Sequence, residues 1–214
     1  MSVREHRLVF FGPPGAGKGT QARRLTSRFG FAHISTGVIL RKIIRADTPL
    51  GQEAAGYIND GNLVPDRIVR ILAEDAMLDA NFSGFILDGY PRTLQQAEWL
   101  QEFLQSQGMS LTTVINFVLS DEDVVSRLSQ RRIHRLTGEN FHLSNKPPPP
   151  EQAEFMITRP DDQPETIKQR LKTYYRDTHP LVEYYRSRDL LRPIDASGAF
   201  TAVYSQICEV LQLS

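Results

Sequence analysis

The amino-acid sequence predicts an α/β protein in which helices wrap a parallel sheet. Three observations predict this class: short apolar runs recur along the chain, they end in polar or turn residues before helical patterns, and the first run ends in a glycine-rich turn. Buried strands that alternate with helices are typical of parallel sheets covered on both faces. Ligands of such sheets bind beyond the carboxyl ends of the strands.

The expected strands are short and strongly apolar. In chain order they are Leu8 to Phe11, Phe31 to Ile34, Phe85 to Leu87, Thr113 to Leu119 and Leu190 to Ile194. Helical patterns cover Lys18 to Phe29, Pro164 to about Arg188 and Ala202 to Leu213. Because proline removes a helical hydrogen bond, we expect Pro180 to kink or interrupt the second of these helices.

Two stretches interrupt the alternation. Between Ser35 and Val64 the pattern predicts short helices, separated at Thr48-Pro49 and at Asp60-Gly61, and no strand. From about Gln130 to Gln163 the periodicity fails, so this stretch is expected to be irregular. A loop of this length inside a compact domain is more often functional than a plain connection.

The prolines of the second stretch also fit a disordered linker. Pro147 to Pro150 form an unbroken run. Phe141, Phe155, Met156 and Ile157 nevertheless supply apolar side chains that can pack, and they favour an ordered segment.

Composition excludes several classes of protein. The 214 residues contain 25 Lys and Arg, of which 20 are Arg, and 25 Asp and Glu, so the formal net charge is zero. Proteins that bind duplex DNA irrespective of sequence are usually strongly basic, and we therefore expect no nucleic-acid partner. No apolar run is long enough to cross a membrane, and the motif at Gly12 leaves no room for a cleaved leader. The single cysteine, Cys208, is expected to be buried and inert, which fits a reducing compartment.

The glycine-rich turn is a phosphate-binding motif. Gly12-Pro13-Pro14-Gly15-Ala16-Gly17-Lys18 matches G-x-x-x-x-G-K between a predicted strand and a predicted helix. Its glycines let backbone N–H groups point inward as an anion nest at a helix N-terminus, and Lys18 adds a point charge. Gly19 stands where Ser or Thr normally offers a hydroxyl to magnesium, and Thr20 follows it.

Three further clusters place an arginine beside a turn. They are Ser35-Thr36-Gly37 with Arg41, Asp88-Gly89-Tyr90-Pro91-Arg92-Thr93 with Gln96, and Arg159-Pro160-Asp161-Asp162 with Arg170. A guanidinium fork at a fixed turn is suited to phosphate oxygens. Hydrolases with a phosphate-binding loop must position water and kinases a second substrate, and these clusters favour a kinase.

With all these motifs in this order, the chain resembles the adenylate kinases, the long-lid form of the nucleoside-monophosphate kinase family, from Val9 to about Gly198. The resemblance implies a five-stranded parallel core, formed by residues 1–34, 65–129 and 163–214. It also implies an AMP-binding insertion, residues 35–64, and a lid, residues 130–162. The implied reaction is the reversible transfer of a phosphoryl group from Mg-ATP to AMP, giving two ADP.

The resemblance also implies roles for individual residues. The donor site would comprise Gly15, Ala16, Gly17, Lys18, Gly19, Thr20, Arg131 and the backbone near Gly198. The AMP site would comprise Thr36, Arg41, Asn62, Leu63, Val64, Gly89, Tyr90, Pro91, Arg92 and Gln96, with Gln96 reading the adenine edge. Arg127 would face the phosphates near Arg131, and Arg159 and Arg170 would close onto both nucleotides. The catalytic set is therefore Lys18, Asp88, Arg92, Arg127, Arg131, Arg159 and Arg170, without a general base.

Mg²⁺ is expected to arrive with ATP and to have no direct protein ligand. Asp88 would organise it through water, or would instead serve as a turn cap. Asp161 and Asp162 would either orient the lid arginines or cap the helix that begins near Pro164. Val38 stands where the family usually has an aspartate, which puts the handling of the metal in doubt.

Two other activities remain open on the sequence alone. The first is a GTP:AMP phosphotransferase, since the family's contacts with the donor base are largely made by backbone. The second is a nucleotide sensor that binds without transfer. The expected partners are ATP, AMP and ADP, without a membrane, and the protein is expected to be a cytoplasmic monomer, with an organelle matrix as the alternative.

The lid is predicted to hold no zinc. Some lids of this family are tied by a cysteine-based zinc site, but residues 130–162 contain no cysteine, and His134 and His142 lack thiolate partners. Removal of metal by a chelator should leave the melting temperature and the Mg-dependent activity unchanged after Mg²⁺ is restored. A stoichiometric zinc atom retained after chelation, measured by elemental analysis, would contradict this prediction.

Overall fold

The computed structural model describes residues 3–46, 48–82 and 84–213. Residues 1–2, 83 and 214 of the predicted core ranges, and residue 47 of the predicted AMP-binding insertion, lie outside this description. A short 3-10 helix, Val3–Glu5, precedes the first strand. No helix among the described residues has the length and apolar character that a membrane crossing requires.

The core is a five-stranded parallel sheet, which confirms the predicted fold class. Its strands are β1 (Arg7–Phe11), β2 (Ala32–Ser35), β3 (Phe85–Asp88), β4 (Thr113–Val118) and β8 (Leu191–Asp195). Their order across the sheet is β2-β3-β1-β4-β8, and all four pairings are parallel. Ser35 pairs with Asp88 in this register, so polar residues of β2 and β3 meet at the carboxyl edge.

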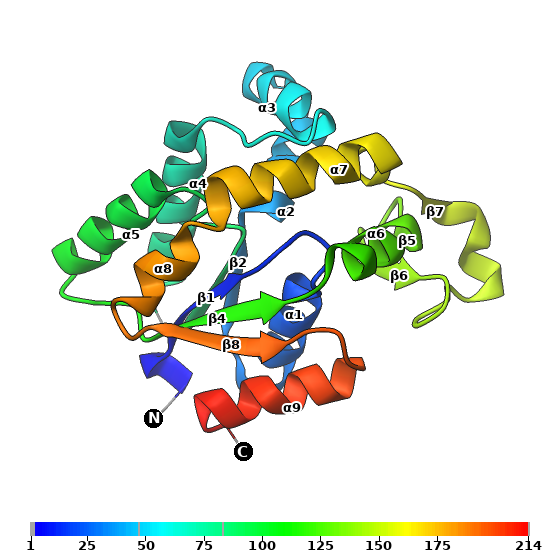
Figure 1. Ribbon diagram of the computed structural model, residues 1–214. Coiled ribbons are helices and arrows are strands. Elements are labelled where there is room, and N and C mark those ends of the chain that lie inside the picture. The colour runs from blue at the N-terminus through cyan, green and yellow to red at the C-terminus, as the bar shows by residue number, and fades with distance from the viewer. Residues whose placement is uncertain (1–2, 47, 83, 214) are drawn as a thin grey trace.

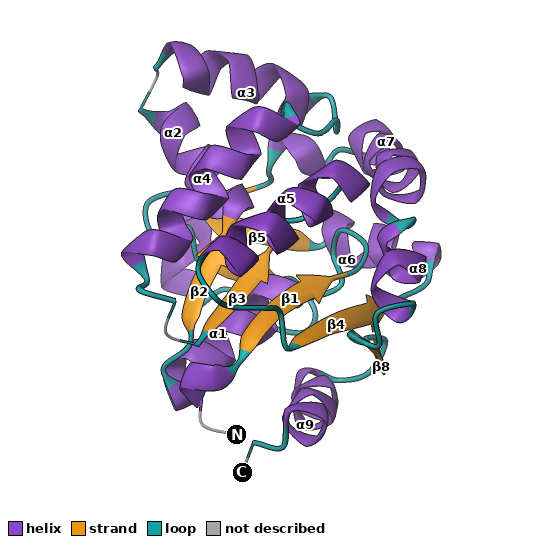
Figure 2. Cartoon of the chain, turned by 90° about the vertical axis from the view of Figure 1, so that its left-hand side faces the viewer, coloured by secondary structure: helices purple, strands orange, loops and turns teal. Residues whose placement is uncertain are grey.

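Alternate side chains of β1 enter two separate apolar clusters. Leu8 and Phe10 pack with α1 (Lys18–Phe29), α6 (Asp121–Ser129) and α9 (Phe200–Leu211). Val9 and Phe11 pack on the other face with α4 (Asp66–Asp79), α5 (Leu94–Ser106) and α8 (Leu181–Arg186). Figures 1 and 2 show the sheet between these two layers of helices. Burial on both faces explains why the strands read as continuous apolar runs.

The first interruption folds as a pair of helices. These are α2 (Thr36–Arg45) and α3 (Pro49–Asn59), which pack against each other, with α3 at the top of Figure 1 and α2 below it. The side chain of Thr48 caps α3, because its Oγ1 accepts from the Gly51 backbone N–H at 3.1 Å. The expected absence of strands and the expected break at Thr48-Pro49 both hold in the described residues of this segment.

The second interruption is not irregular throughout, so that part of the prediction was wrong. It contains a three-stranded antiparallel sheet of β5 (Arg131–His134), β6 (Asn140–His142) and β7 (Met156–Ile157), with β5 in the centre. Strands of two to four residues are too short for an alternating pattern to be visible in the sequence. A 3-10 helix, Pro150–Phe155, follows the proline run and leads into β7.

Aromatic contacts hold this small sheet together. The ring of His134 stacks on that of Phe155, with the ring centroids 5.1 Å apart. The guanidinium of Arg135 also lies over the Phe155 ring, 5.3 Å from its centroid. Lys146 lies over Phe141 at 4.9 Å and forms an ion pair with Glu139. These side chains provide the packing that a segment without a large core needs.

The helix expected from Pro164 is divided into three pieces. They are α7 (Pro164–Thr173), a π-helical turn at Tyr174–Thr178, and α8, which begins after Pro180. The helix is therefore interrupted, as Pro180 predicts, but the interruption begins at Tyr174, six residues before the proline. Cys208 packs against the α9 side of the sheet but is half-buried, so the expectation of full burial was wrong.

Two glycines of α3 provide a matched test of how α2 and α3 pack. A Cβ on Gly51 would lie 2.5 Å from the Ile43 carbonyl oxygen of α2, whereas a Cβ on Gly56 would have no atom within 4 Å. Gly51→Ala should therefore lower the free energy of unfolding by about 1 to 3 kcal/mol through overpacking. Gly56→Ala should raise it by about 0.5 to 1 kcal/mol. Urea unfolding measures both, and equal effects would contradict this packing.

Candidate active site

The phosphate-binding loop joins β1 to α1 at the carboxyl edge of the sheet. Gly17 precedes the helix with a φ of 90°, and the first turns of α1 close onto it, since the backbone N–H groups of Thr20 and Gln21 donate to its carbonyl. Lys18 Nζ folds back over the loop and donates to the Gly12 and Pro13 carbonyl oxygens, each at 2.7 Å. The loop thus combines a helix N-terminus with an ammonium group, which is an anion-binding arrangement.

The carboxylate of Asp88 explains why residue 19 is glycine. A Cβ on Gly19 would lie 3.0 Å from Asp88 Oδ2, so the Ser or Thr usual at this position would have to displace the carboxylate. Thr20, the next residue, is exposed at the start of α1. An acidic side chain from β3 therefore occupies the space beside the loop.

Asp88 is held by two neighbours on β2. Its Oδ2 lies 3.3 Å from His33 Nε2 and accepts from Ser35 Oγ at 3.4 Å. Burial alone would raise the pKa of Asp88, but the His33 contact and the charge of Lys18 lower it below its ordinary value. An ionised carboxylate oxygen is the ligand type that Mg²⁺ and its water shell prefer, and no described residue hydrogen-bonds Oδ1. The site therefore fits a magnesium ion brought in by a nucleotide.

His33 is a site residue that the sequence analysis missed. A signal was present, because His33 lies two positions before Ser35 in an expected strand, and residues two apart share a face. Only the pairing of β2 with β3 shows that this face meets Asp88.

Most of the predicted AMP-binding residues line one cavity. Its walls come from α2, the segment between α3 and α4, the turn after β3, and α7. The lining includes Thr36, Arg41, Asn62, Leu63, Val64, Gly89, Arg92, Gln96, Asp161 and Arg170. Tyr90 and Pro91 do not line the cavity, because the side chains of both are buried. Tyr90 packs in the apolar cluster that contains Val9 and Phe11 of β1.

The turn after β3 requires glycine at position 89. Gly89 has a φ of 86°, and a Cβ there would lie 2.9 Å from Thr36 Oγ1 and 3.1 Å from Arg92 Nη2. The guanidinium of Arg92 folds over this turn, and its Nε donates to the Gly89 carbonyl at 2.9 Å. The glycine therefore lets Thr36 and Arg92 approach the same point.

Carboxylates after the lid sheet hold two of the predicted arginines. Arg131 Nε donates to Asp162 Oδ2 at 2.7 Å, and Arg170 Nη1 donates to Asp162 Oδ1 at 3.2 Å and pairs with Asp161 at 2.9 Å. The side chain of Asp162 is fully buried, and Gln163, not an aspartate, takes the N-cap position of α7 without a side-chain cap. Asp161 and Asp162 therefore orient arginines in this structure. Arg159 donates to Asn140 Oδ1 at 3.1 Å.

Several cationic side chains lie close together between the phosphate-binding loop and the cavity, and their pKa values are lowered. Burial, with the charges of Arg92, Arg170 and Arg131, lowers the pKa of Lys18 to about 8. Burial also lowers the pKa of Arg159 to about 9 and, despite the nearby Asp161, that of Arg41 to about 10. Lowered pKa values on several cations together mean that the site favours the approach of negative charge.

Arg127 contacts a different part of the chain from the other arginines. Its Nη2 donates to the carbonyl oxygens of Ala196 at 2.7 Å and Ser197 at 3.0 Å, directly before Gly198. The structure therefore joins α6 to the loop that precedes α9, where the sequence analysis expects the donor base.

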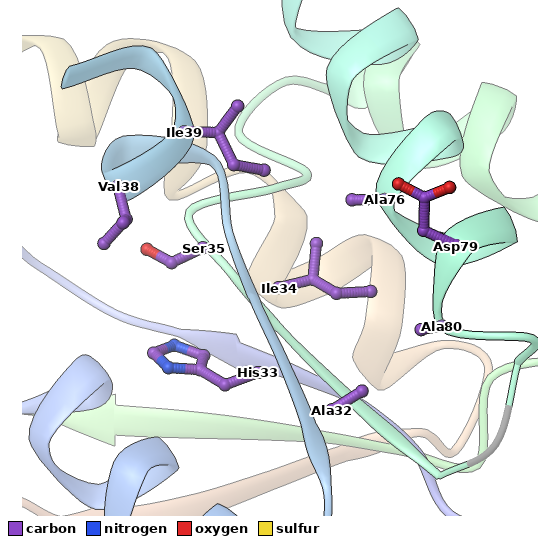
Figure 3. Close-up of a pocket in the computed structure, with 9 residues that line it drawn as sticks. All are labelled: Ala32, His33, Ile34, Ser35, Val38, Ile39, Ala76, Asp79 and Ala80. Atoms are coloured by element: carbon purple, nitrogen blue, oxygen red, sulfur yellow. The ribbon is translucent and has the colours of Figure 1, made fainter. Parts of the chain in front are cut away.

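A cavity of about 440 Å³ lies outside β2, away from these cations. Figure 3 shows Ile34 on the side of α4 with Ala76 and Asp79, while His33 and Ser35 project to the opposite side. Val38 lies at its rim and is 53% exposed. Its lining is mainly apolar and lacks the predicted phosphate-binding residues, so it is not the reaction site. Within the described residues, no three His, Cys, Asp or Glu side chains group as metal ligands would.

Comparison with known proteins agrees with this geometry. The sequence model of the family described as "Adenylate kinase" matches residues 10–190. The adenylate kinase of Salinibacter ruber is 51% identical over 206 residues, which cover 96% of this chain and 97% of that protein. Those of Methanococcoides burtonii (41%; 95% and 97% covered) and Clostridium botulinum strain Eklund 17B (39%; 96% and 98% covered) are also similar.

The chain belongs to the adenylate kinase family. The predicted family, fold class and enzyme class are thereby confirmed: this is a kinase that transfers a phosphoryl group from ATP to AMP. No observation favours GTP as donor or a catalytically silent sensor. An adenylate kinase needs one anion site for each nucleotide, and the phosphate-binding loop and the cavity beside it offer two.

Proposed function

We propose that the phosphate-binding loop holds ATP and the adjoining cavity holds AMP, so that phosphoryl transfer occurs between them. One observation carries this proposal: Arg92 and Arg170 of the cavity lie close enough to Lys18 of the loop for their charges to add to the burial that lowers its pKa. Cations from both sites thus lie together where the phosphates of the two nucleotides would flank the transferred phosphoryl group.

The donor would bind through backbone and cations together. Gly15 to Thr20 would surround the phosphates with N–H groups, Lys18 would contact the terminal phosphates, and Arg131 would approach from β5. Gly198 would lie against the donor base. Arg127 supports this arrangement through its two hydrogen bonds to the preceding carbonyls, and its proposed role is to position that loop.

The acceptor would bind in the cavity. Arg41 and Arg92 would hold the AMP phosphate, while Thr36 and the backbone of Asn62 to Val64 would line the nucleoside. Gln96 would meet the base, and the guanidinium groups of Arg159 and Arg170 would close on the phosphates from the lid side. Tyr90 and Pro91 would act through the backbone of their turn, since their side chains are buried away from the cavity.

The chemistry requires positioning and charge, and no proton abstraction. An oxygen of the AMP phosphate is already ionised, so it attacks the terminal phosphorus of ATP as the bond from that phosphorus to the bridging oxygen breaks, which leaves two ADP. Lys18 and the arginines offset the charge spread over the transferred group. Mg²⁺, when bound with ATP, supplies further charge neutralisation at the phosphate oxygens. Asp88 would hold its water shell and is also the counter-charge of Lys18.

We further propose the division into a core of residues 1–34, 65–129 and 163–214, an AMP-binding insertion of residues 35–64 and a lid of residues 130–162. The two insertions supply residues to opposite sides of the same site, and their movement would exclude water from the terminal phosphate of ATP. A cytoplasmic location, which the single cysteine supports, and a monomeric state complete the proposal.

A transfer assay tests the activity and the role of the loop. Mg-ATP with AMP should yield two ADP per ATP consumed, measured by chromatography, and Mg-GTP should be a poor donor. Lys18→Ala should remain folded and lose roughly 10²- to 10³-fold in kcat, because one preorganised cation is removed from the transition state. Activity within a few-fold of wild type would mean that the loop has been misassigned.

Arg92→Ala tests the acceptor side separately. It should lower kcat/KM for AMP by on the order of 2 to 4 kcal/mol, because a charged contact with the AMP phosphate is lost. The KM for ATP should change little. Initial rates at varied AMP and varied ATP measure both values, and an equal loss for the two nucleotides would place Arg92 between them and not in the acceptor site.

The lowered pKa of Lys18 predicts how ATP binding depends on pH. A neutral lysine must take up a proton to hold phosphate, and bound phosphate raises its pKa again. The affinity should therefore be nearly constant below pH 8 and weaken by up to about tenfold per pH unit above it. Calorimetry between about pH 7 and pH 9 measures this effect. Lys18→Arg, whose side chain stays charged, should bind without this pH dependence, and a wild-type affinity independent of pH would contradict the prediction.

A further inference from the structure

The amide of Gln96 is held from behind by two groups on different elements. Its Oε1 accepts from the backbone N–H of Arg92 at 2.7 Å, and its Nε2 donates to Asp66 Oδ1 at 2.8 Å. Gln96 is 1% exposed and lies in the first turn of α5, while Asp66 begins α4. Gln96 lines the acceptor cavity and Asp66 does not, so the Asp66 carboxylate reaches that cavity through its hydrogen bond to Gln96.

Both partners of the Gln96 amide have fixed hydrogen-bonding directions. A backbone N–H can only donate, and an ionised carboxylate can only accept. A reversed amide would set its NH₂ against the Arg92 N–H and its oxygen against the Asp66 carboxylate, so the buried Gln96 amide would lose both hydrogen bonds. The Gln96 oxygen therefore faces Arg92 and its nitrogen faces Asp66.

Thr93 fixes Asp66 in turn. The Thr93 hydroxyl donates to Asp66 Oδ2 at 2.7 Å. Thr93 Oγ1 is also the N-cap of α5, since it accepts from the Gln96 backbone N–H at 3.2 Å. Each carboxylate oxygen of Asp66 thus has one donor from the start of α5. The orientation of the Gln96 amide is set by a closed network and not by Gln96 alone.

The remaining hydrogen-bonding capacity of Gln96 matches one kind of purine. One lone pair on Oε1 and one N–H on Nε2 are left for a ligand in the cavity. Adenine presents an amino donor beside a ring-nitrogen acceptor, which pairs with this amide in two hydrogen bonds. A 6-oxopurine presents an acceptor where adenine has its amino group and a donor at N1, and this edge pairs only with the reversed amide.

We propose that Asp66 is a positioning residue that determines specificity for the acceptor base: by fixing the Gln96 amide in one orientation, it makes the cavity accept a 6-aminopurine and reject a 6-oxopurine. This inference rests on the proposed assignment of Gln96 to the base of AMP. It assigns a role to an aspartate that would otherwise be explained by the general preference for acidic residues in the first turn of a helix.

The experiment compares AMP with inosine monophosphate, which differs in carrying a 6-oxo group, as acceptors at saturating Mg-ATP. Asp66→Leu keeps the size of the side chain and removes the acceptor. The ratio of kcat/KM for AMP to that for inosine monophosphate should fall by on the order of tenfold or more, because the freed amide can reverse. The KM for AMP should rise, and the KM for ATP should stay within about twofold of wild type.

Two further variants separate orientation from charge and from helix stability. Asp66→Asn retains an oxygen that can accept from Gln96 Nε2, so it should keep the selectivity within a few-fold of wild type. Asp75→Leu removes an exposed acid from the same helix and should leave selectivity unchanged. Asp66→Ala replaces Asp66→Leu as the loss variant if the leucine variant does not fold.

The wild-type protein offers a readout that does not depend on the folding of an Asp66 variant. The side-chain NH₂ of Gln96, assigned by its loss in Gln96→Glu, should be protected from hydrogen exchange without any nucleotide. Exchange as fast as in exposed glutamines would overturn the proposal. So would unchanged selectivity in a folded Asp66→Leu or Asp66→Ala, or an equal loss in Asp66→Asn. Failure of the wild type to form ADP from ATP and AMP would instead overturn the proposed function, so the two failures are distinguishable.

Discussion

Repulsion between like charges is the constraint on which the structure around this site depends. Lys18, Arg41, Arg131, Arg159 and Arg170 come from five separate parts of the chain, and burial together with the charges of neighbouring cations lowers the pKa values of three of them, Lys18, Arg41 and Arg159. At short range and low dielectric such repulsion amounts to several kcal/mol. Three carboxylates, of Asp88, Asp161 and Asp162, offset part of it. The remaining positive charge is what the phosphate groups of two bound nucleotides would neutralise.

The sheet and its register make this crowding possible. The order β2-β3-β1-β4-β8 places the loop after β1 next to the turn after β3, and pairing of Ser35 with Asp88 brings the start of α2 to the same edge. Packing on both faces fixes the strands, so the apolar interior holds the polar edge rigid. Arginines on α7 and β5 then reach the site from the lid side, supported by carboxylates that are themselves buried.

Selectivity and charge are handled by different parts of the site. The phosphate side consists of several cations, of which Lys18 contacts two carbonyl oxygens and Arg170 two carboxylates. The base side consists of Gln96, held by one donor and one acceptor whose directions cannot change. Both depend on the turn from Gly89 to Arg92, because its backbone carries the Arg92 N–H and its glycine admits the Arg92 guanidinium. A small number of backbone positions therefore couples phosphate binding to base recognition.

Local patterns in the sequence determined the sheet strands, the phosphate-binding loop and the paired helices α2 and α3, since continuous apolar runs and glycine-proline turns act within a few residues. They did not reveal the lid sheet, whose strands are too short to show a period, nor the half-exposure of Cys208. The partners of the charged and polar groups were decided only by tertiary structure. His33 with Asp88, Arg127 with Ala196, and Gln96 with Asp66 are 55, 69 and 30 residues apart. A hydrogen bond depends on positions within a few tenths of an ångström, and only the packed fold sets these positions.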